Sequence, residues 1–273
     1  MPPTAYAVPE ERSSPRVAAA WALGCGGVAT NENFLIDDRD VALFGSPARV
    51  ELVAEAKRQG RNLYYVDHSY WRRSKQFRIA KNCMQSIVSI PKVVERYNQR
   101  MRTEAKPLRI PQRFVDCRAP LAPEWQTHGS SILICPNSPA YMAWFGIDAK
   151  QWTLDIAAEV SKYSDRPIVI RWKRGAKQRP FYLDVHDAWA TIVFSSGAAV
   201  ESLTHGVPVF VKADWATTAP MGLSDLSLIE TPYYPEHRIP FLWELAERQW
   251  TLEEIGKGLA WKWFTAHRDE AAI

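Results

Sequence analysis

Long apolar runs, paired cysteines and a dinucleotide-binding glycine motif are all missing from this sequence of 273 residues. No window approaches 18 consecutive apolar residues, which argues against a membrane-spanning helix. The four cysteines lie far apart and form no CxxC pair, so the sequence offers neither a zinc-binding pattern nor a disulfide framework. This cysteine usage favours a reducing, cytoplasmic setting.

The amino-terminal residues lack the features of a targeting peptide. Residues 1–16 are polar, proline-rich and partly acidic, so we predict a loose tail and neither a signal nor a transit peptide. The apolar run 17–23 is interpreted as a first strand. The glycines at 24, 26 and 27 then predict a turn with a close backbone or ligand approach, although they do not match GxGxxG.

Strand and helix patterns alternate along the rest of the chain, which predicts an α/β fold. Prolines between residues 107 and 123 make one stretch extended and linker-like. We therefore expect an amino-terminal domain, 1–125, and a carboxy-terminal domain, 126–273. The expected strands are 40–45, 62–68, 131–135, 168–173, 191–194 and 207–211, and the expected helices are 48–59, 92–105, 152–161, 198–204, 241–249 and 251–264.

Acidic residues are scarce in residues 71–118, which contain thirteen basic and only three acidic side chains. This region carries a net charge of +10 and the rest of the chain carries −6, although the total is only +4. Such segregation predicts a surface for an anionic partner such as nucleic acid. A solvated basic helix face is the alternative interpretation.

Tryptophan, by contrast, is abundant, with twelve residues in the chain. Several of them fall beside expected loops, where aromatic rings interleaved with arginine suit stacking on bases or sugars. Packing in the core explains tryptophans equally well. The loop-flanking residues are Trp71, Trp144, Trp152, Trp172 and Trp215.

The turn Ser195-Ser196-Gly197 carries the strongest functional signal. It joins an apolar strand pattern to a helical one, so it opens a helix whose end Gly206 is placed to cap. Unsatisfied N–H groups and the helix dipole make such a turn favourable for a phosphate. Glu201 lies one helical turn further, within reach of a sugar hydroxyl. An ordinary βαβ unit with a serine cap is the alternative.

Polar side chains also follow two other expected strands. Asp67 and His68 end the strand 62–68, where ligands bind in open α/β sheets, so they are the candidate general bases. A turn-capping aspartate and a structural histidine are the alternatives. Arg171 and Lys173 end the strand 168–173 on one face and are placed to meet a diphosphate, unless they form a solvated edge. The candidates for acceptor or nucleic-acid binding are Arg72, Arg73, Lys75, Arg78 and Asn82.

The run from His186 to Phe210 resembles the donor-binding half of GT-B fold glycosyltransferases. It combines a strand, a serine turn, a helix with a glutamate and the strand start Gly206-Val-Pro-Val. The tail from Ala219 is similar to capsule-type sugar transferases and to their phage-encoded relatives. The segments Leu63–Tyr70 and Phe77–Asn82 are also similar to the phage-encoded group. The resemblance covers about residues 130–260 well. It implies two Rossmann-like, doubly wound domains that face a cleft.

The resemblance also implies roles for individual residues. It implies a nucleotide-sugar as co-substrate, no further cofactor and no metal. Asp67 or His68 would deprotonate the acceptor hydroxyl from the other domain. The donor phosphate would lie on Ser195, Ser196 and Gly197, the ribose on Glu201, and the diphosphate or leaving group near Ser138, Arg171 and Lys173.

The sequence thus predicts a glycosyltransferase, and the acceptor is a separate question. Because a basic region lies next to the candidate base, we predict a hydroxymethylated pyrimidine in phage DNA, flipped towards the cleft, in the host cytoplasm. One alternative is a transferase of the capsule or lipopolysaccharide type that acts on a glycan. Another is a nucleic-acid-binding protein that has lost catalysis. The sequence does not determine the sugar, the nucleotide or the oligomeric state.

Overall fold

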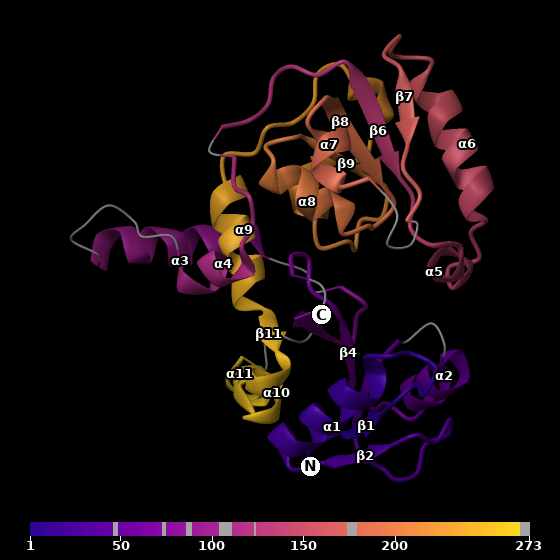
Figure 1. The fold of residues 1–273 in the computed structure, drawn as a ribbon, viewed down its shortest axis with the longest axis vertical. Coiled ribbons are helices and arrows are strands. Elements are labelled where there is room, and N and C mark those ends of the chain that lie inside the picture. Colours follow the sequence, from indigo (N-terminus) through magenta and orange to yellow (C-terminus); the bar gives the residue numbers. More distant parts are fainter. Residues whose placement is uncertain are drawn as a thin grey trace. The chain divides into compact units, whose positions relative to one another are not determined.

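The computed structural model describes residues 1–45, 49–72, 75–85, 89–103, 111–122, 124–173 and 179–267. The chain divides into two compact units (Figure 1). The first unit comprises Met1–Ser86 and Arg248–Ile273, and the second comprises Ile87–Glu247. Each unit contains its own sheet, so the fold is mixed α/β with two parallel-sheet regions.

This division differs from the expected one at residue 125. Residues 87–125 group with the second sheet, because α3 (Ile90–Thr103) and α4 (Gln112–Cys117) pack on α9 (Arg238–Glu247). The chain then returns to the first sheet, where β11 (Gln249–Thr251) pairs antiparallel with β5 (Gln76–Lys81). The first unit is therefore built from two distant segments of the chain.

The sheet of the first unit has six strands in the order β11-β5-β4-β3-β1-β2. Its four neighbouring strands β2, β1, β3 and β4 are all parallel, while β5 pairs antiparallel with β4, and β11 pairs antiparallel with β5. The parallel strands are β1 (Thr4–Tyr6), β2 (Val28–Thr30), β3 (Val41–Phe44) and β4 (Leu63–His68), and α2 (Val50–Arg58) connects the last two.

The expected tail and first strand were both wrong. Thr4–Tyr6 is a buried strand inside the sheet, and the run interpreted as a strand lies within the helix α1 (Ser14–Cys25). Alanine is the strongest helix former and Pro15 occupies the first turn, where proline fits a helix. The buried positions Val17, Trp21 and Cys25 recur every four residues, as one face of a helix requires.

The expected close backbone approach occurs at two of the three glycines: Gly27 approaches the Pro3 carbonyl oxygen, and Gly24 lies in a contact between helices. α1 packs on α10 (Leu252–Gly256), which α11 (Leu259–Ala266) follows. A Cβ atom at Gly24 would lie 1.9 Å from the carbonyl oxygen of Ile255. Only glycine therefore permits this helix pair. Helix α10 begins with a capping box between Thr251 and Glu254.

The sheet of the second unit has five strands in the order β10-β9-β8-β6-β7, all parallel. It resembles the doubly wound sheet expected for residues 126–273. The strands are β6 (Ser131–Cys135), β7 (Ile168–Ile170), β8 (Ala188–Val193), β9 (Val209–Val211) and β10 (Gly222–Leu223).

Helices cover both faces of this sheet. One face packs on α6 (Ala149–Val160), whose Ile156 and Val160 share an apolar core with Ile132, Ile192 and other strand residues. The expected helix at 198–204 is α8 (Ala198–Thr204), and Gly206 follows it with a left-handed φ of 76°. The remaining elements are α5 (Pro139–Ala143), α7 (Phe181–Val185), η2 (Ala219–Met221) and η3 (Leu226–Leu228).

A buried arginine ties the start of the second unit to its end. Arg238 of α9 is 2% exposed, and its guanidinium donates to the carbonyl oxygens of Leu203 and Ala122 at 2.7 and 2.9 Å. It also lies over the ring of Trp125. Burial lowers the pKa of Arg238 to about 10, against a weaker opposing effect of Glu124. These contacts are structural and hold Ala122 and Trp125, near the end of the proline-rich stretch, to the second unit.

Candidate functional site

The point where the strand order of the second sheet reverses lies between β6 and β8. From β6 the chain crosses to β7 on one side, returns to β8 on the other side and continues to β9. Doubly wound sheets bind ligands at this position, outside the carboxyl ends of the strands, because the two crossovers leave a crevice there. The chain that leaves β6 contains Ser138, and the chain that leaves β8 contains Ser195, Ser196 and Gly197.

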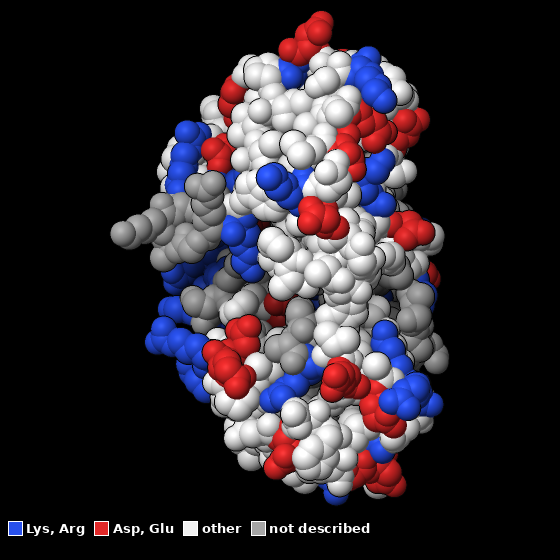
Figure 2. All heavy atoms as spheres, turned by 90° about the vertical axis from the view of Figure 1, so that its right-hand side faces the viewer, with Lys and Arg blue, Asp and Glu red and all other residues white. Residues whose placement is uncertain are grey.

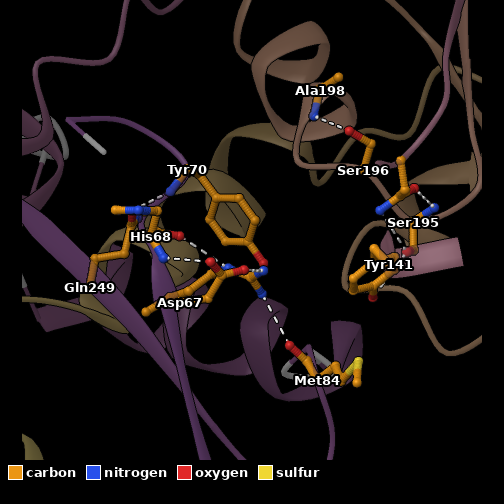
Figure 3. Close-up of polar contacts among 11 residues, drawn as sticks. Asp67, His68, Tyr70, Met84, Tyr141, Ser195, Ser196, Ala198 and Gln249 are labelled. Carbon is orange, nitrogen blue, oxygen red and sulfur yellow. Dashed lines mark hydrogen bonds and ion pairs between the residues drawn. The ribbon is translucent and has the colours of Figure 1, made fainter. Parts of the chain in front are cut away.

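Side chains from both strand ends meet at this point (Figure 3). The amide of Asn137 accepts a hydrogen bond from the Ser195 backbone N–H at 3.1 Å and donates to Ser195 Oγ at 3.4 Å. Ser195 Oγ also donates to the Tyr141 hydroxyl oxygen at 3.3 Å. Ser195 is 2% exposed, so its hydroxyl takes part in an internal polar network. We predicted Ser195 here, but Asn137 and Tyr141 were missed.

Two of the residues predicted to bind the nucleotide-sugar, Ser138 and Ser196, accept hydrogen bonds from backbone N–H groups at the starts of helices. Ser138 is the N-cap of α5, and its Oγ accepts from the Tyr141 N–H. Ser196 Oγ accepts from the Ala198 N–H at 3.3 Å, at the start of α8, where Gly197 is the N-cap (Figure 3). The Ala198 N–H, one of the groups expected to donate to a phosphate, thus already donates to Ser196 in the turn. Both serines are half-buried, which leaves part of their surface accessible.

Two of the charged candidates, Arg171 and Glu201, lie on the α8 side of the second sheet. Thr191 of β8 bonds to Ser202 of α8, so the odd-numbered residues of this strand face that helix. By the same alternation Cys135 ends β6 on that side. Burial raises the pKa of the Cys135 thiol to about 12, with Arg171 opposing and Glu201 adding to the effect. Arg171 and Glu201 therefore both act electrostatically on the thiol at the end of β6.

Arg171 is held in place by the neighbouring helix α7. Its guanidinium forms an ion pair with Asp184, donates to the carbonyl oxygen of Arg179 at 2.7 Å and lies over the Phe181 ring. Burial lowers the pKa of Arg171, while Cys135 and Glu201 raise it. Strand β7 ends at Ile170, two residues before Trp172, so Lys173 lies in the exposed chain beyond it. Only the first of the two predicted strand-end cations is therefore built into the sheet edge.

The candidate bases lie at the carboxyl end of β4 in the first unit. Asp67 lies opposite Arg78 in the β4–β5 ladder and forms an ion pair with it (Figure 3). It also accepts from the His68 N–H at 2.7 Å. Desolvation raises the pKa of Asp67, but Arg78, the His68 N–H and the His68 charge together lower it below its ordinary value. The His68 ring packs edge-on against Phe44 and stacks on Phe77, with centroids at 5.2 and 5.9 Å.

The predicted acceptor-binding residues have mainly structural contacts. Arg78 bonds to the carbonyl oxygens of His68 and Met84 besides Asp67, and lies over the Tyr70 ring. Asn82 adopts a left-handed φ of 59° and bonds to the Leu63 N–H and to Asn62. Among the other candidates, Arg72 is half-buried with a φ of 30°, Lys75 is exposed, and Arg73 lies outside the described residues.

The basic region, residues 71–118, divides between the two units, and several of its described arginines pair with acids from elsewhere in the chain. In the second unit Arg96 pairs with Glu244 at 2.9 Å and Arg113 with Glu247 at 3.5 Å. In Figure 2, acidic and basic side chains are interspersed over the part of the second unit at the top, whereas Lys and Arg gather along the left side at mid-height. Charge segregation in the sequence is therefore partly cancelled by ion pairs.

Neither a metal-binding cluster nor a membrane-spanning helix occurs in the described parts of the chain. No group of three His, Cys, Asp or Glu side chains there has the arrangement of a metal site. None of the helices in those parts combines the length and apolar character needed to cross a bilayer.

Among known proteins, the chain aligns with a solved structure over most of its length. No protein-family model matches the chain, and no curated protein matches its sequence. The KpsC beta Kdo 2,4 transferase of Thermosulfurimonas dismutans aligns with a TM-score of 0.50 and 9% identity, over 91% of this chain and 92% of that one. The beta Kdo 2,7 transferase of KpsC from the same organism gives 0.46 and 12%, over 94% and 98%. At such identities the likeness concerns the fold, which is therefore of a kind found in a glycosyltransferase.

Proposed function

We propose that the chain is a glycosyltransferase that binds the nucleotide part of a nucleotide-sugar at the β6/β8 strand ends of the second unit. The observation that carries the proposal is the meeting of polar side chains at the reversal point of an all-parallel sheet. Asn137 and Ser195 join the two strand ends, and Ser196 and Gly197 open α8 beside them. The fold shared with a Kdo transferase over most of both chains supports the same assignment.

The donor-binding roles follow from the chemistry of this edge. A phosphate near Ser196 and Gly197 would be favoured by the helix dipole. Arg171 and Arg179 share the single carboxylate of Asp184, so a net positive charge remains with which Arg171 would offset the charge of the departing nucleotide. Glu201 is the candidate partner of a ribose hydroxyl. Ser138 and Ser195 support the turn through their hydrogen bonds, and Lys173 is an exposed cation for the diphosphate.

His68 is the stronger of the two candidates for the general base. A base needs a proton affinity near the working pH, and the pKa of Asp67 lies below even its ordinary acidic value. Asp67 is also engaged by Arg78. We therefore assign proton abstraction from the acceptor hydroxyl to His68 and the positioning of the β4 end to Asp67.

We propose a glycan as the acceptor rather than DNA. The DNA interpretation depended on a basic region of net charge +10, and Arg78, Arg96 and Arg113 of that region are ion-paired with acids. Paired cations release fewer counterions on binding a polyanion, so they contribute less to nucleic-acid affinity. The neighbouring structures are named as Kdo transferases of KpsC, so an activated Kdo is the first donor to test.

The proposal is tested by calorimetric titration with a panel of nucleotide-sugars that includes nucleotide-activated Kdo, followed by transfer assays on the donor that binds. The acceptors are oligosaccharides and, separately, duplex DNA with and without hydroxymethylated pyrimidines. We expect donor binding and transfer to an oligosaccharide. Transfer to modified DNA alone would replace the glycan assignment, and salt-sensitive DNA binding without any donor binding would overturn the enzyme assignment.

The base is tested in the same assay with His68→Gln. We expect at least a hundredfold loss of the transfer rate with little change in donor affinity, since general base catalysis contributes about 100- to 10,000-fold. The matched control is His128→Gln, which changes an exposed histidine of the second unit. Equal rates for both variants would remove His68 from the mechanism.

A further inference from the structure

Five aromatic rings form a continuous cluster at the carboxyl edge of the second sheet. The members of this ring cluster are Tyr141, Phe145, Trp152, Phe194 and Trp215. Phe145 and Trp215 stack with centroids 5.0 Å apart and planes at 24°. Phe194 meets these two rings edge-on at 5.7 and 5.9 Å and meets Trp152 at 6.2 Å. Tyr141 tilts against Phe145 at 5.4 Å.

The ring cluster lies on the opposite side of the sheet from Arg171 and Glu201. Ile192 of β8 points into the core beneath α6, and Phe194 continues the same alternation just beyond the strand end. Trp215 follows β9. Tyr141 lies in α5, which comes after β6, and Phe145 lies just beyond this helix, so all three are near the carboxyl ends of strands. The strand edge therefore has an aromatic side and a charged side, and the Asn137–Ser195 pair joins them.

The rings are not fully enclosed by the protein. Phe145 is 37% exposed, and the other four are only half-buried, whereas the core ring of Phe210 in the same sheet is fully buried. An aromatic side chain that served packing alone would gain most by complete burial. Accessible ring surface next to a polar site is instead typical of ligand pockets, where apolar walls accompany a few polar groups.

We infer that the ring cluster binds the planar base of the nucleotide by stacking, with Phe145 and Trp215 as the principal rings. This inference rests on the proposed function, because it assigns the base of the same donor. Phe145 and Trp215 already form a parallel stack, and a base adds a third ring in the same geometry.

The connection to the hydroxyl turn favours a base over the transferred sugar. Tyr141 contacts Ser195 Oγ through its hydroxyl and contacts Phe145 through its ring. The Phe145 ring is thus separated from the serine turn by the length of the Tyr141 side chain and one ring contact. In a nucleotide the ribose separates phosphate and base in a comparable way, whereas in a sugar phosphate the ring is attached to the phosphate directly.

Binding by stacking has a consequence for specificity. Every base offers a π face, so stacking tolerates different bases and leaves discrimination to hydrogen bonds at the base edge. We therefore expect the ring cluster to raise the affinity for all nucleotides by a similar factor. It should have no effect on ligands that lack a base.

The experiment is calorimetric titration of the full chain with the diphosphates of adenosine, guanosine, cytidine and uridine, and with pyrophosphate and ribose 5-phosphate. The variant is Phe145→Leu, which keeps an apolar side chain at an exposed position and removes the ring. We expect roughly 5- to 100-fold weaker binding of the nucleotide that binds best, and unchanged binding of the two ligands without a base. Phe145→Tyr should restore the affinity.

The matched control is Tyr163→Ala, which removes a 46% exposed ring just after α6, at the other end of the crossover. It should bind nucleotides as the unchanged chain does. A second readout is the upfield shift of the base proton resonances that stacking on a ring produces, which we expect to be lost in Phe145→Leu.

The two possible failures are distinguishable. If the unchanged chain binds none of the four nucleotides and no nucleotide-sugar, the proposed function is overturned together with this inference. Equal nucleotide affinity of the unchanged chain, Phe145→Leu and Trp215→Leu would overturn the inference alone. A loss of pyrophosphate affinity equal to the loss of nucleotide affinity would also overturn it, because the ring would then act on the phosphate site.

Discussion

Both units contain four parallel strands in the same spatial order. In the first unit this order is β2-β1-β3-β4, and in the second it is β7-β6-β8-β9. In each, the first strand leads to a helix that begins beside a Ser-Pro pair, Ser14-Pro15 in one and Ser138-Pro139 in the other. The two reversal points, between β1 and β3 and between β6 and β8, are therefore topologically equivalent.

The side chains at these equivalent points differ in what they contact. Ser14 is fully buried, accepts from the Val8 N–H at 2.8 Å and donates to the Phe44 carbonyl oxygen at 3.1 Å. Arg49 donates to the Ala7 carbonyl oxygen nearby at 2.8 Å. At the second reversal point Ser138 and Ser196 are half-buried. Among the described residues, which do not include 46–48 after β3, the first reversal point uses its hydroxyl for internal hydrogen bonds, whereas the second leaves polar groups accessible.

The first unit also depends on the segment that begins at Arg248, which returns to it after the second unit. The largest expected effect comes from a change where this returning segment packs on α1. Gly24→Ala would place a Cβ atom 1.9 Å from the Ile255 carbonyl oxygen, so α1 and α10 would have to separate. We expect the free energy of unfolding of the first unit to fall by about 3 kcal/mol or more, since overpacking costs about 1–3 kcal/mol even without a backbone clash. Hydrogen exchange measured by mass spectrometry would assign the loss to one unit.

The control for this change is Gly256→Ala, at the same helix contact. A Cβ atom there would meet only Leu23 and Ala20, at 3.8 and 3.9 Å, which is ordinary contact. We expect a loss below about 1 kcal/mol. Equal protection of both units in Gly24→Ala would show that the first unit does not depend on the returning segment.

The next effect concerns the accessible reversal point. Ser196→Glu places a carboxylate where we propose a phosphate, so like-charge repulsion should weaken nucleotide binding about 100-fold or more. The unfolding temperature should change little, because Ser196 is half-buried. The measurement is calorimetric titration with the nucleoside diphosphate that binds best, and unchanged affinity would break the contrast between the two reversal points.

Much of the fold was predictable from the sequence where local signals agreed. Helix α8 has a small-residue turn before it and Gly206 after it, and α10 begins with a capping box. The strand β1 was not predictable in the same way, since three residues beside prolines give no periodicity. The run 17–23 is apolar enough for a buried strand or a helix, and only its alanine content favours the helix.

Individual candidate residues could be proposed from the sequence, but the hydrogen bonds that join them could not. The serine turn could be found because strand, turn and helix patterns adjoin in the sequence. The pairing of Asn137 with Ser195 depends on the register of two strands, and these residues are 58 positions apart. The ion pairs of Arg96 and Arg113 likewise involve acids of α9, so counting charges along the sequence overestimates the basic surface.

A smaller effect is expected at the closed reversal point. Ser14→Ala leaves the Val8 N–H and the Phe44 carbonyl oxygen without the hydroxyl that joins them. An unsatisfied buried polar group costs about 1–3 kcal/mol, so we expect the first unit to lose stability in that range. Nucleotide affinity should stay unchanged. The measurement is urea unfolding beside calorimetry, and a loss of affinity without a loss of stability would contradict internal closure.

The smallest effect concerns the ion pair at the end of β4, the neighbour of the closed reversal point. The pKa of Asp67 is lowered in the folded protein, so its ionised form stabilises the fold at neutral pH. This contribution is lost as the pH falls from the ordinary value near 3.8 through the lower folded value. The Asp67 side chain is 53% exposed, so the coupling with Arg78 should stay below about 1 kcal/mol.

A double-mutant cycle of Asp67→Asn and Arg78→Gln isolates this coupling from the hydrogen bonds that Arg78 makes to His68 and Met84. Free energies of unfolding in urea at pH 7 should give a favourable coupling energy, and the same cycle near pH 3 should give a smaller one. A coupling energy that does not change with pH would mean that the ionised carboxylate contributes nothing. The β4 end would then owe its position to the two carbonyl contacts of Arg78 alone, and Asp67 would return as a candidate for the acceptor-side chemistry that we assign to His68.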